Sequence, residues 1–219
     1  MRETLKQSKF HRILFGEFHR NLKISDFDIG IFSTVTFLSL FGVVMIASVT
    51  IPLTDGSLSM TFNHIVKLIL SIFIGLLIFR VSLSTWKKID IFLIIFSFFL
   101  LTLVFFPFIG FEANGASRWI RILGFSFQPS ELMKFSLIIY ISSYCFRRMT
   151  EFKEKWLGFW KPVLVVISAI ALVLVEPDLG SSAVIFLISL TIMFIAGAPL
   201  KQMLIIFFMG LSVFISMIF

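Results

Sequence analysis

Short polar segments interrupt a chain that is otherwise mostly apolar, and the first that suggests chemistry is residues 109–128. It holds Arg118, Trp119 and Arg121. Guanidinium groups bind phosphate oxygens through paired hydrogen bonds, while an indole suits a membrane interface. Two arginines three residues apart, with a tryptophan between them, therefore predict a helical or turned patch that binds phosphate. The alternative is that the arginines bind lipid headgroups or pair with Glu112.

The second polar segment begins at Gln128 and runs into an apolar stretch. Pro129 suits the first position of a helix, and Glu131 then lies in the first turn, where the helix dipole favours an anion. Lys134 follows on the same face. Helix capping by itself explains the glutamate, but an ionisable pair inside a membrane span also indicates a cavity or a substrate path. The helix N-terminus, Lys134 and the two preceding arginines predict a positive pocket suited to a pyrophosphate.

The third polar segment is an acidic turn, residues 176–180, that ends a short apolar run over 162–175. A helix over that run is about 21 Å long, against a hydrocarbon core of roughly 30 Å. Either residues 159–161 extend the helix, or the turn is sunk below the membrane surface, where its acids must face protein or a water-filled cavity. A further reading, compatible with both, is that Asp178 caps the next helix.

The elements that must position these residues are apolar helices. The composition is 58% hydrophobic and 14% charged, whereas a soluble domain carries roughly 25% charged residues, so a water-soluble globule is excluded. We predict an all-α polytopic membrane protein with about seven transmembrane helices, because span-length apolar runs recur. These runs cover residues 29–49, 65–82, 89–108, 129–146, 162–175, 179–196 and 203–219.

The charges predict an orientation in the membrane. All but four of the 19 lysines and arginines lie in the N-terminal 28 residues or in loops that should face the cytoplasm, so the N-terminus is expected inside. We predict a cytoplasmic basic tail over 1–28 and a transmembrane domain over 29–219. Within the tail, apolar residues at every fourth position from Phe10 to Leu22 indicate an interfacial amphipathic helix or a simple solvated tail. The four exceptions are Lys67, Arg118, Arg121 and Lys134.

Other kinds of chemistry find little support. Cys145 is the only cysteine, which excludes an internal disulfide and a CxxC site. Nucleotide-binding, zinc-protease and serine-hydrolase motifs do not occur, no metal-binding residues are predicted, and the basic tail comes with no nucleic-acid-binding module. The last apolar run stops at Phe219 without a polar flank, so we expect the chain to be a piece of a longer membrane protein.

Several sequence blocks resemble one family of membrane proteins. The chain is similar, over about residues 25–219, to the SEDS family of shape, elongation, division and sporulation proteins, and most similar to its division members. This resemblance implies a fold of roughly ten helices, of which this chain would supply the N-terminal portion. The blocks are GASRWI (115–120), QPSELMK (128–134), FWKP (159–162), EPDLGSS (176–182) and FIAGA (194–198).

The resemblance implies a peptidoglycan glycosyltransferase of septal cell-wall synthesis. It would polymerise lipid II at the outer face of the bacterial cytoplasmic membrane, working with a class B penicillin-binding protein and other division proteins. A carboxylate would deprotonate the acceptor sugar, cations would stabilise the departing lipid pyrophosphate, and a divalent cation, Mg²⁺ or Mn²⁺, would offset the same charge. The substrate-binding residues implied are Arg118, Trp119, Arg121, Gln128, Glu131, Lys134 and Asp178.

One departure from the family bears on activity. The aspartate proposed as the family's catalytic base lies in an outer loop after the seventh span, beyond residue 219, so no catalytic base is assigned here. We therefore expect these 219 residues alone not to polymerise lipid II. A lipid II flippase and a non-catalytic division scaffold are the alternatives. A flippase needs polar groups through the depth of the bundle, whereas the charged candidates here cluster on one side.

Overall fold

The computed structural model describes residues 28–53, 58–106, 110–113, 116–122 and 125–218. The chain divides into two compact units, residues 1–80 and 81–219. Of the tail predicted over 1–28, residues 1–27 lie outside the described residues. The amphipathic helix considered within the tail lies outside them too.

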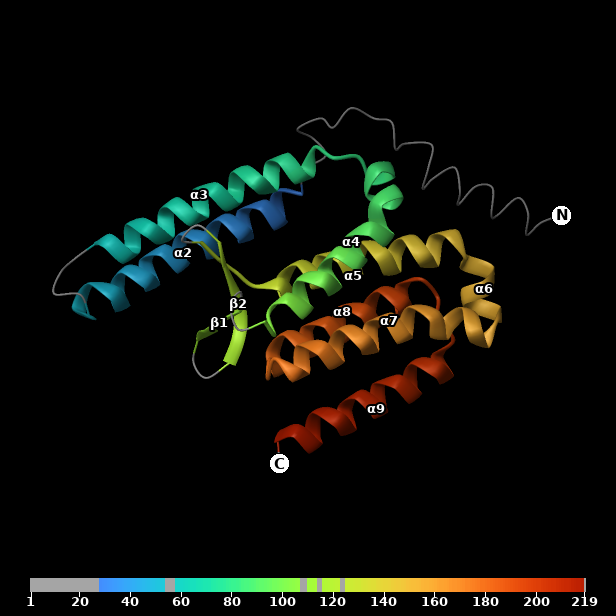
Figure 1. Ribbon diagram of the computed structural model, residues 1–219. Coiled ribbons are helices and arrows are strands. Elements are labelled where there is room, and N and C mark those ends of the chain that lie inside the picture. Colours follow the sequence, from blue (N-terminus) through green and yellow to red (C-terminus); the bar gives the residue numbers. More distant parts are fainter. Residues whose placement is uncertain (1–27, 54–57, 107–109, 114–115, 123–124, 219) are drawn as a thin grey trace. The chain divides into compact units, whose positions relative to one another are not determined.

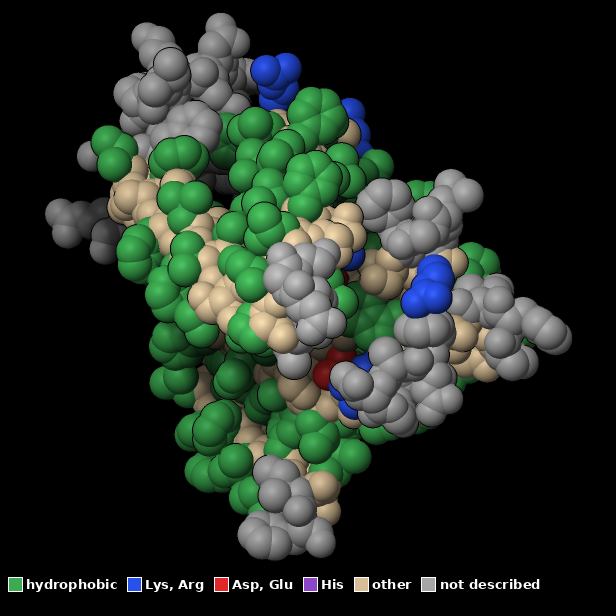
Figure 2. All heavy atoms as spheres, turned by 90° about the vertical axis from the view of Figure 1, so that its left-hand side faces the viewer, with side chains coloured by type: hydrophobic (Ala, Val, Ile, Leu, Met, Phe, Trp, Pro, Cys, Tyr) green, Lys and Arg blue, Asp and Glu red, His purple; other side chains and the backbone are tan. Residues whose placement is uncertain are grey.

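The described part of the first unit is a pair of long apolar helices. Helix α2 (Ile29–Leu53) packs against helix α3 (Ser59–Phe79), and the Oγ1 atoms of Thr50 and Thr61 lie 3.1 Å apart in a hydrogen bond between them (Figure 1). Most of their large apolar side chains are exposed. Hydrophobic side chains cover much of the described surface in Figure 2. Surfaces of this kind are stable in lipid and not in water.

The second unit is a helical bundle with a small sheet at one end (Figure 1). Its closest helix pairs are α4 with α5, α5 with α8 and α7 with α8, and its core includes Leu101, Met133, Ile141, Phe159 and Ile185. The described elements are α4 (Leu83–Leu103), β1 (Gly110–Ala113), β2 (Ala116–Ile122), β3 (Phe125–Phe127), α5 (Pro129–Arg147), α6 (Met149–Glu154), α7 (Trp156–Val175), α8 (Leu179–Ile195) and α9 (Leu200–Ile218).

Polar side chains join α4 to α5 inside this bundle. The hydroxyls of Ser97 and Ser136 are both buried and lie 2.6 Å apart. Nearer the α6 end, Arg147 Nη2 donates to Asp90 Oδ2 at 2.6 Å. Small hydroxyl-bearing residues let helices approach closely, and each buried polar group here has its partner on the facing helix.

The helical fold class predicted from the sequence is confirmed. Each of the predicted apolar runs falls largely within a helix, and among the described residues four helices, α2, α3, α7 and α9, are long and apolar enough to cross a membrane. Helix α8 is apolar but shorter. The number of spans stays a prediction.

The prediction of a helical or turned patch at Arg118 and Arg121 was wrong. These residues lie on β2, the central strand of an antiparallel sheet ordered β1-β2-β3, in which Ile120 is opposite Gly110 on one side and Phe127 on the other. Tryptophan and isoleucine favour strands, which outweighs the helical reading of the spacing. The register with β1 skips Arg118, as in a β-bulge, so the usual alternation of faces does not relate its side chain to that of Arg121.

Helix α7 shows how the short apolar run over 162–175 is long enough to cross a membrane. It begins at Trp156 and has 20 residues, so residues 159–161 extend it as the first alternative predicted. At 1.5 Å per residue the helix is about 30 Å long, enough to cross a hydrocarbon core. The acidic turn that follows therefore need not be sunk below the membrane surface.

A short elbow, α6, connects α5 to α7. Glu151 on α6 accepts hydrogen bonds from Arg148 Nη1 at 2.7 Å and from Lys161 Nζ at 3.0 Å. These bonds, that from Arg148 foremost, lower the pKa of Glu151 to about 2. The elbow thus stays charged and paired throughout the neutral range, at the end of the bundle opposite the sheet (Figure 1).

Replacing Gly158 with alanine is expected to destabilise this elbow. A Cβ atom at that position would lie 2.0 Å from the backbone oxygen of Glu151, so the backbone itself must move. The expected loss is about 1–3 kcal/mol in the free energy of unfolding, measured by thermal unfolding in detergent micelles. Gly75→Ala on α3 is the matched control, because nothing lies within 4 Å of its added Cβ. Equal stabilities of the two variants would contradict the close approach.

Candidate functional site

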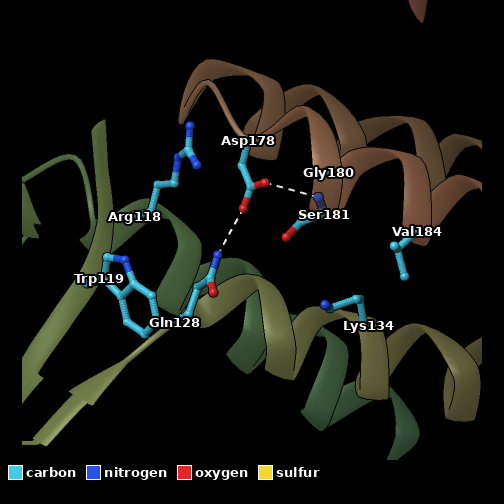
Figure 3. A pocket seen from close by; sticks show the side chains of 8 residues that line it. All are labelled: Arg118, Trp119, Gln128, Lys134, Asp178, Gly180, Ser181 and Val184. Carbon is cyan, nitrogen blue, oxygen red and sulfur yellow. Dashed lines mark hydrogen bonds between the residues drawn. The ribbon is translucent and has the colours of Figure 1, made fainter. Parts of the chain in front are cut away.

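A cavity lies at the sheet end of the second unit, among β2, the first turns of α5 and the turn between α7 and α8 (Figure 3). Its volume is about 420 Å³, within the usual range of ligand-binding pockets, roughly 300–1,000 Å³. The residues that line it are Arg118, Trp119, Gln128, Lys134, Asp178, Gly180, Ser181 and Val184.

Arg118 ties the sheet to the turn between α7 and α8. Its Nε donates to the backbone oxygen of Glu176 at 3.1 Å, and its Nη2 donates to the backbone oxygen of Pro177. Both acceptors are neutral carbonyl groups, so they do not offset the positive charge of the guanidinium. Three of its five N–H groups are not used in these two bonds. The alternative prediction, that the arginines pair with Glu112, is not tested, because the side chain of Glu112 lies outside the described part of the chain.

Asp178 joins the starts of two helices. Its Oδ1 accepts from the backbone N–H of Ser181 at 3.0 Å, which caps α8. Its Oδ2 accepts from Nε2 of Gln128, the residue that precedes α5, at 2.9 Å. The capping role considered from the sequence is therefore confirmed, and the same carboxylate lines the cavity (Figure 3). With both oxygens engaged, Asp178 is held in place and its charge is partly offset.

Lys134 forms the ion pair predicted from the sequence. Its Nζ lies 2.6 Å from Oε1 of Glu131, one turn earlier on α5, and Glu131 is in the first turn after Pro129 as expected. The lysine side chain is 18% exposed and lines the cavity, whereas the glutamate is 58% exposed and does not. An ammonium group has three donors, so two remain for a ligand.

The structure brings five of the seven predicted site residues to one cavity. Glu131 reaches it only through its ion pair, and Arg121 is exposed and does not line it. The binding roles of all seven stay predictions. The residues that line the cavity together are Arg118, Trp119, Gln128, Lys134 and Asp178.

Sequence reasoning noted Glu176 but did not place it in the site. Its side chain is 1% exposed, and neither carboxyl oxygen has a hydrogen-bond partner. Burial, with a contribution from nearby Asp178, raises the pKa of Glu176 to about 8, although Arg118 opposes the shift. The carboxyl therefore carries a proton at neutral pH. In the sequence, the only signal of its burial was its position at the start of the acidic turn.

The cavity suits an anion with oxygen atoms more than it suits a metal ion. Arg118 and Lys134 present unused N–H donors, and the first turns of α5 and α8 add partial positive charge. Within the described part of the chain, no three His, Cys, Asp or Glu residues gather as metal ligands. The described residues thus do not by themselves make a site for the divalent cation that the resemblance implies, and no chemical step is derived through it.

Comparisons with known proteins identify the family. Residues 29–219 match the family of cell cycle proteins FtsW, RodA and SpoVE. A protein of Saccharophagus degradans is 38% identical over 189 residues, covering 84% of this chain and 49% of its own length. One of Wigglesworthia glossinidia brevipalpis is 34% identical over 203 residues, covering 90% and 53%. Both are named probable peptidoglycan glycosyltransferase FtsW.

Solved structures show the same fold. The crystal structure of the rod shape determining protein RodA of Thermus thermophilus superposes with a TM-score of 0.72 at 23% identity, covering 88% of this chain and 60% of RodA. A chain of a peptidoglycan synthase complex superposes with a TM-score of 0.69 at 25% identity, covering 86% and 53%. The chain spans about half the length of the curated relatives it matches. It is an integral membrane protein and belongs to the FtsW/RodA/SpoVE family, the SEDS family that its motifs predicted.

Proposed function

We propose that this chain belongs to a peptidoglycan glycosyltransferase that polymerises lipid II in septal cell-wall synthesis, and that its cavity binds the lipid pyrophosphate. The observation that carries the proposal is the presence of Arg118 and Lys134 around one cavity of about 420 Å³. The names of the relatives, probable peptidoglycan glycosyltransferases, support the reaction class.

The chemistry follows from what departs in glycosyl transfer from a pyrophosphate-linked sugar. As the glycosidic bond breaks, negative charge grows on the leaving pyrophosphate. A guanidinium fixed by Glu176 and Pro177 and an ammonium fixed by Glu131 stabilise that charge without having to reorganise at the moment of reaction. Arg118 supplies paired donors, and Lys134 supplies a point charge. Asp178 acts as the brace between α5 and α8, and no base is assigned within this chain.

The setting is the bacterial cytoplasmic membrane at the division septum, with the N-terminus in the cytoplasm and the cavity on the outer side. The end of the bundle at α6, which carries Arg147, Arg148 and Lys155, lies opposite the end with the sheet (Figure 1), as two sides of a membrane require. The cavity is at the sheet end. A class B penicillin-binding protein and other division proteins are the proposed partners. A neighbour in fold comes from a peptidoglycan synthase complex described as coordinating polymerization and crosslinking.

Binding of a pyrophosphate lipid tests the proposal without requiring turnover. We expect the chain in phosphatidylcholine nanodiscs to bind undecaprenyl pyrophosphate at least roughly tenfold more tightly than undecaprenol, which has the same chain and no charge, and to lose that preference as ionic strength rises. Equal affinity for the two lipids would contradict it. Adding Mg²⁺ or Mn²⁺ to the same measurement tests the proposed divalent cation.

A further inference from the structure

Glu176 is buried without a partner beside the cavity. It is the first residue after α7, is 1% exposed, and neither Oε1 nor Oε2 has a hydrogen-bond partner. Within the described part of the chain, it is the only ionisable side chain whose buried oxygens or nitrogens lack partners. A buried carboxylate in this condition is strongly disfavoured, whereas the neutral acid is tolerated.

A cation lies next to Glu176 without pairing with its side chain. Arg118 Nε donates to the backbone oxygen of Glu176, 3.1 Å away, and Nη2 donates to that of Pro177. The guanidinium thus lies against the turn that carries the carboxyl group, but it bonds to the backbone of that turn and not to the carboxyl group. Such an arrangement is the one expected of a neutral acid, because an ionised one would draw the guanidinium to itself.

The other charges around this turn oppose ionisation or act at the cavity. Asp178, from the same turn, carries a negative charge that disfavours a second one on Glu176. From α5, the neutral amide of Gln128 is directed to Asp178, and Lys134 lines the cavity with Glu131 as its partner. From β2, only Arg118 acts in the direction of ionisation.

We propose that Glu176 is a positioning residue that controls Arg118: the protonated acid leaves the guanidinium free to bind the ligand's pyrophosphate, and loss of the proton draws it away. The inference rests on the proposed function, because it concerns the same anion. By linkage, a bound pyrophosphate favours the proton on Glu176 to the same extent that the proton favours the pyrophosphate.

The sign of the effect follows from the protonation state. Burial places the pKa of Glu176 at about 8, so the acid is neutral at pH 7 and Arg118 presents its full charge to the cavity. Above pH 8 a carboxylate competes with the ligand for the guanidinium. The affinity of the cavity for the anion is therefore highest below the pKa of Glu176 and falls as the pH rises through that pKa.

The test is the pH dependence of lipid II binding by the chain in phosphatidylcholine nanodiscs. Each phosphate of lipid II has one ester and one anhydride bond, so its remaining acidic oxygen stays ionised from pH 7 to pH 9 and the pyrophosphate does not titrate. We expect the affinity of the unmodified chain to fall about tenfold between pH 7 and pH 9. Glu176→Gln should keep its pH 7 affinity at pH 9. Glu154→Gln, an exposed acid on α6, is the matched control and should fall like the unmodified chain.

The outcomes separate this inference from the proposed function. If lipid II binds at pH 7 but Glu176→Gln loses affinity as steeply as the unmodified chain, the inference is wrong and the proposed function stands. If lipid II does not bind at any pH, the proposed function fails. Infrared spectroscopy without ligand gives a second readout: the C=O band of a protonated carboxyl should disappear as the pH rises through about 8 and be missing in Glu176→Gln. A band unaffected by the substitution overturns the inference.

Discussion

Replacing Arg118 with alanine is expected to weaken binding of lipid II by about 10- to 100-fold, the cost of losing charge-assisted hydrogen bonds to one phosphate. Arg118 lines the cavity and is held there by two backbone carbonyls, so its donors are already oriented for a ligand. Lysine at the same position should recover only part of the affinity, because an ammonium cannot supply paired donors. The measurement is lipid II affinity in nanodiscs at pH 7.

Arg121→Ala is the control for this experiment. Arg121 lies on the same strand and carries the same charge, but it is exposed and does not line the cavity. Its removal should change affinity by less than about threefold, since an exposed charge is screened by solvent and salt. Equal losses from the two substitutions would show that the net positive charge of the sheet, and not the cavity, attracts the lipid.

Replacing Arg147 with methionine is expected to cause a large loss of stability, about 2–3 kcal/mol, at the lower end for a buried ion pair because the arginine is 36% exposed. The side chain of Asp90 on α4 is 2% exposed, and Arg147 on α5 donates to it at 2.6 Å. Without the arginine a buried carboxylate loses its ion-pair partner. The measurement is the free energy of unfolding in detergent micelles, and Asp90→Asn in the same chain should restore part of the loss because it removes the isolated charge.

Arg148→Met serves as the neighbouring control for Arg147. Arg148 pairs with Glu151 at 2.7 Å, but this arginine is 56% exposed and Glu151 still has Lys161. Its removal should cost much less, because solvent and the second cation compensate. Equal destabilisation by the two substitutions would contradict the view that burial of Asp90 makes its ion pair important.

The helices and their boundary signals could be predicted from the sequence because they depend on neighbouring residues. Long apolar runs predict spans, Pro129 marks the start of α5, and Asp178 three residues before Ser181 predicts the cap of α8. The Glu131–Lys134 pair also follows from spacing on one helix. Such features need no knowledge of the rest of the fold.

The sheet and the state of Glu176 could not be predicted because they depend on distant contacts. A three-residue spacing places Arg118 and Arg121 on one face of a helix, but in β2 the register with β1 skips Arg118 while Arg121 pairs with Ser126 of β3. The choice between helix and strand depends on this pairing with β1 and β3. Glu176 is buried where Arg118, 58 residues earlier in the chain, docks onto its turn. The bond from Gln128 to Asp178 likewise spans 50 residues.

The central claim is that the cavity binds a lipid pyrophosphate, and a structure of the complex tests it most directly. An experimental structure of the chain in nanodiscs with undecaprenyl pyrophosphate should show both phosphates between the first turns of α5 and α8, within hydrogen-bonding distance of the Arg118 guanidinium and the Lys134 ammonium. A diphosphate bound instead to the exposed side chain of Arg121, with the cavity free of it, would contradict the account.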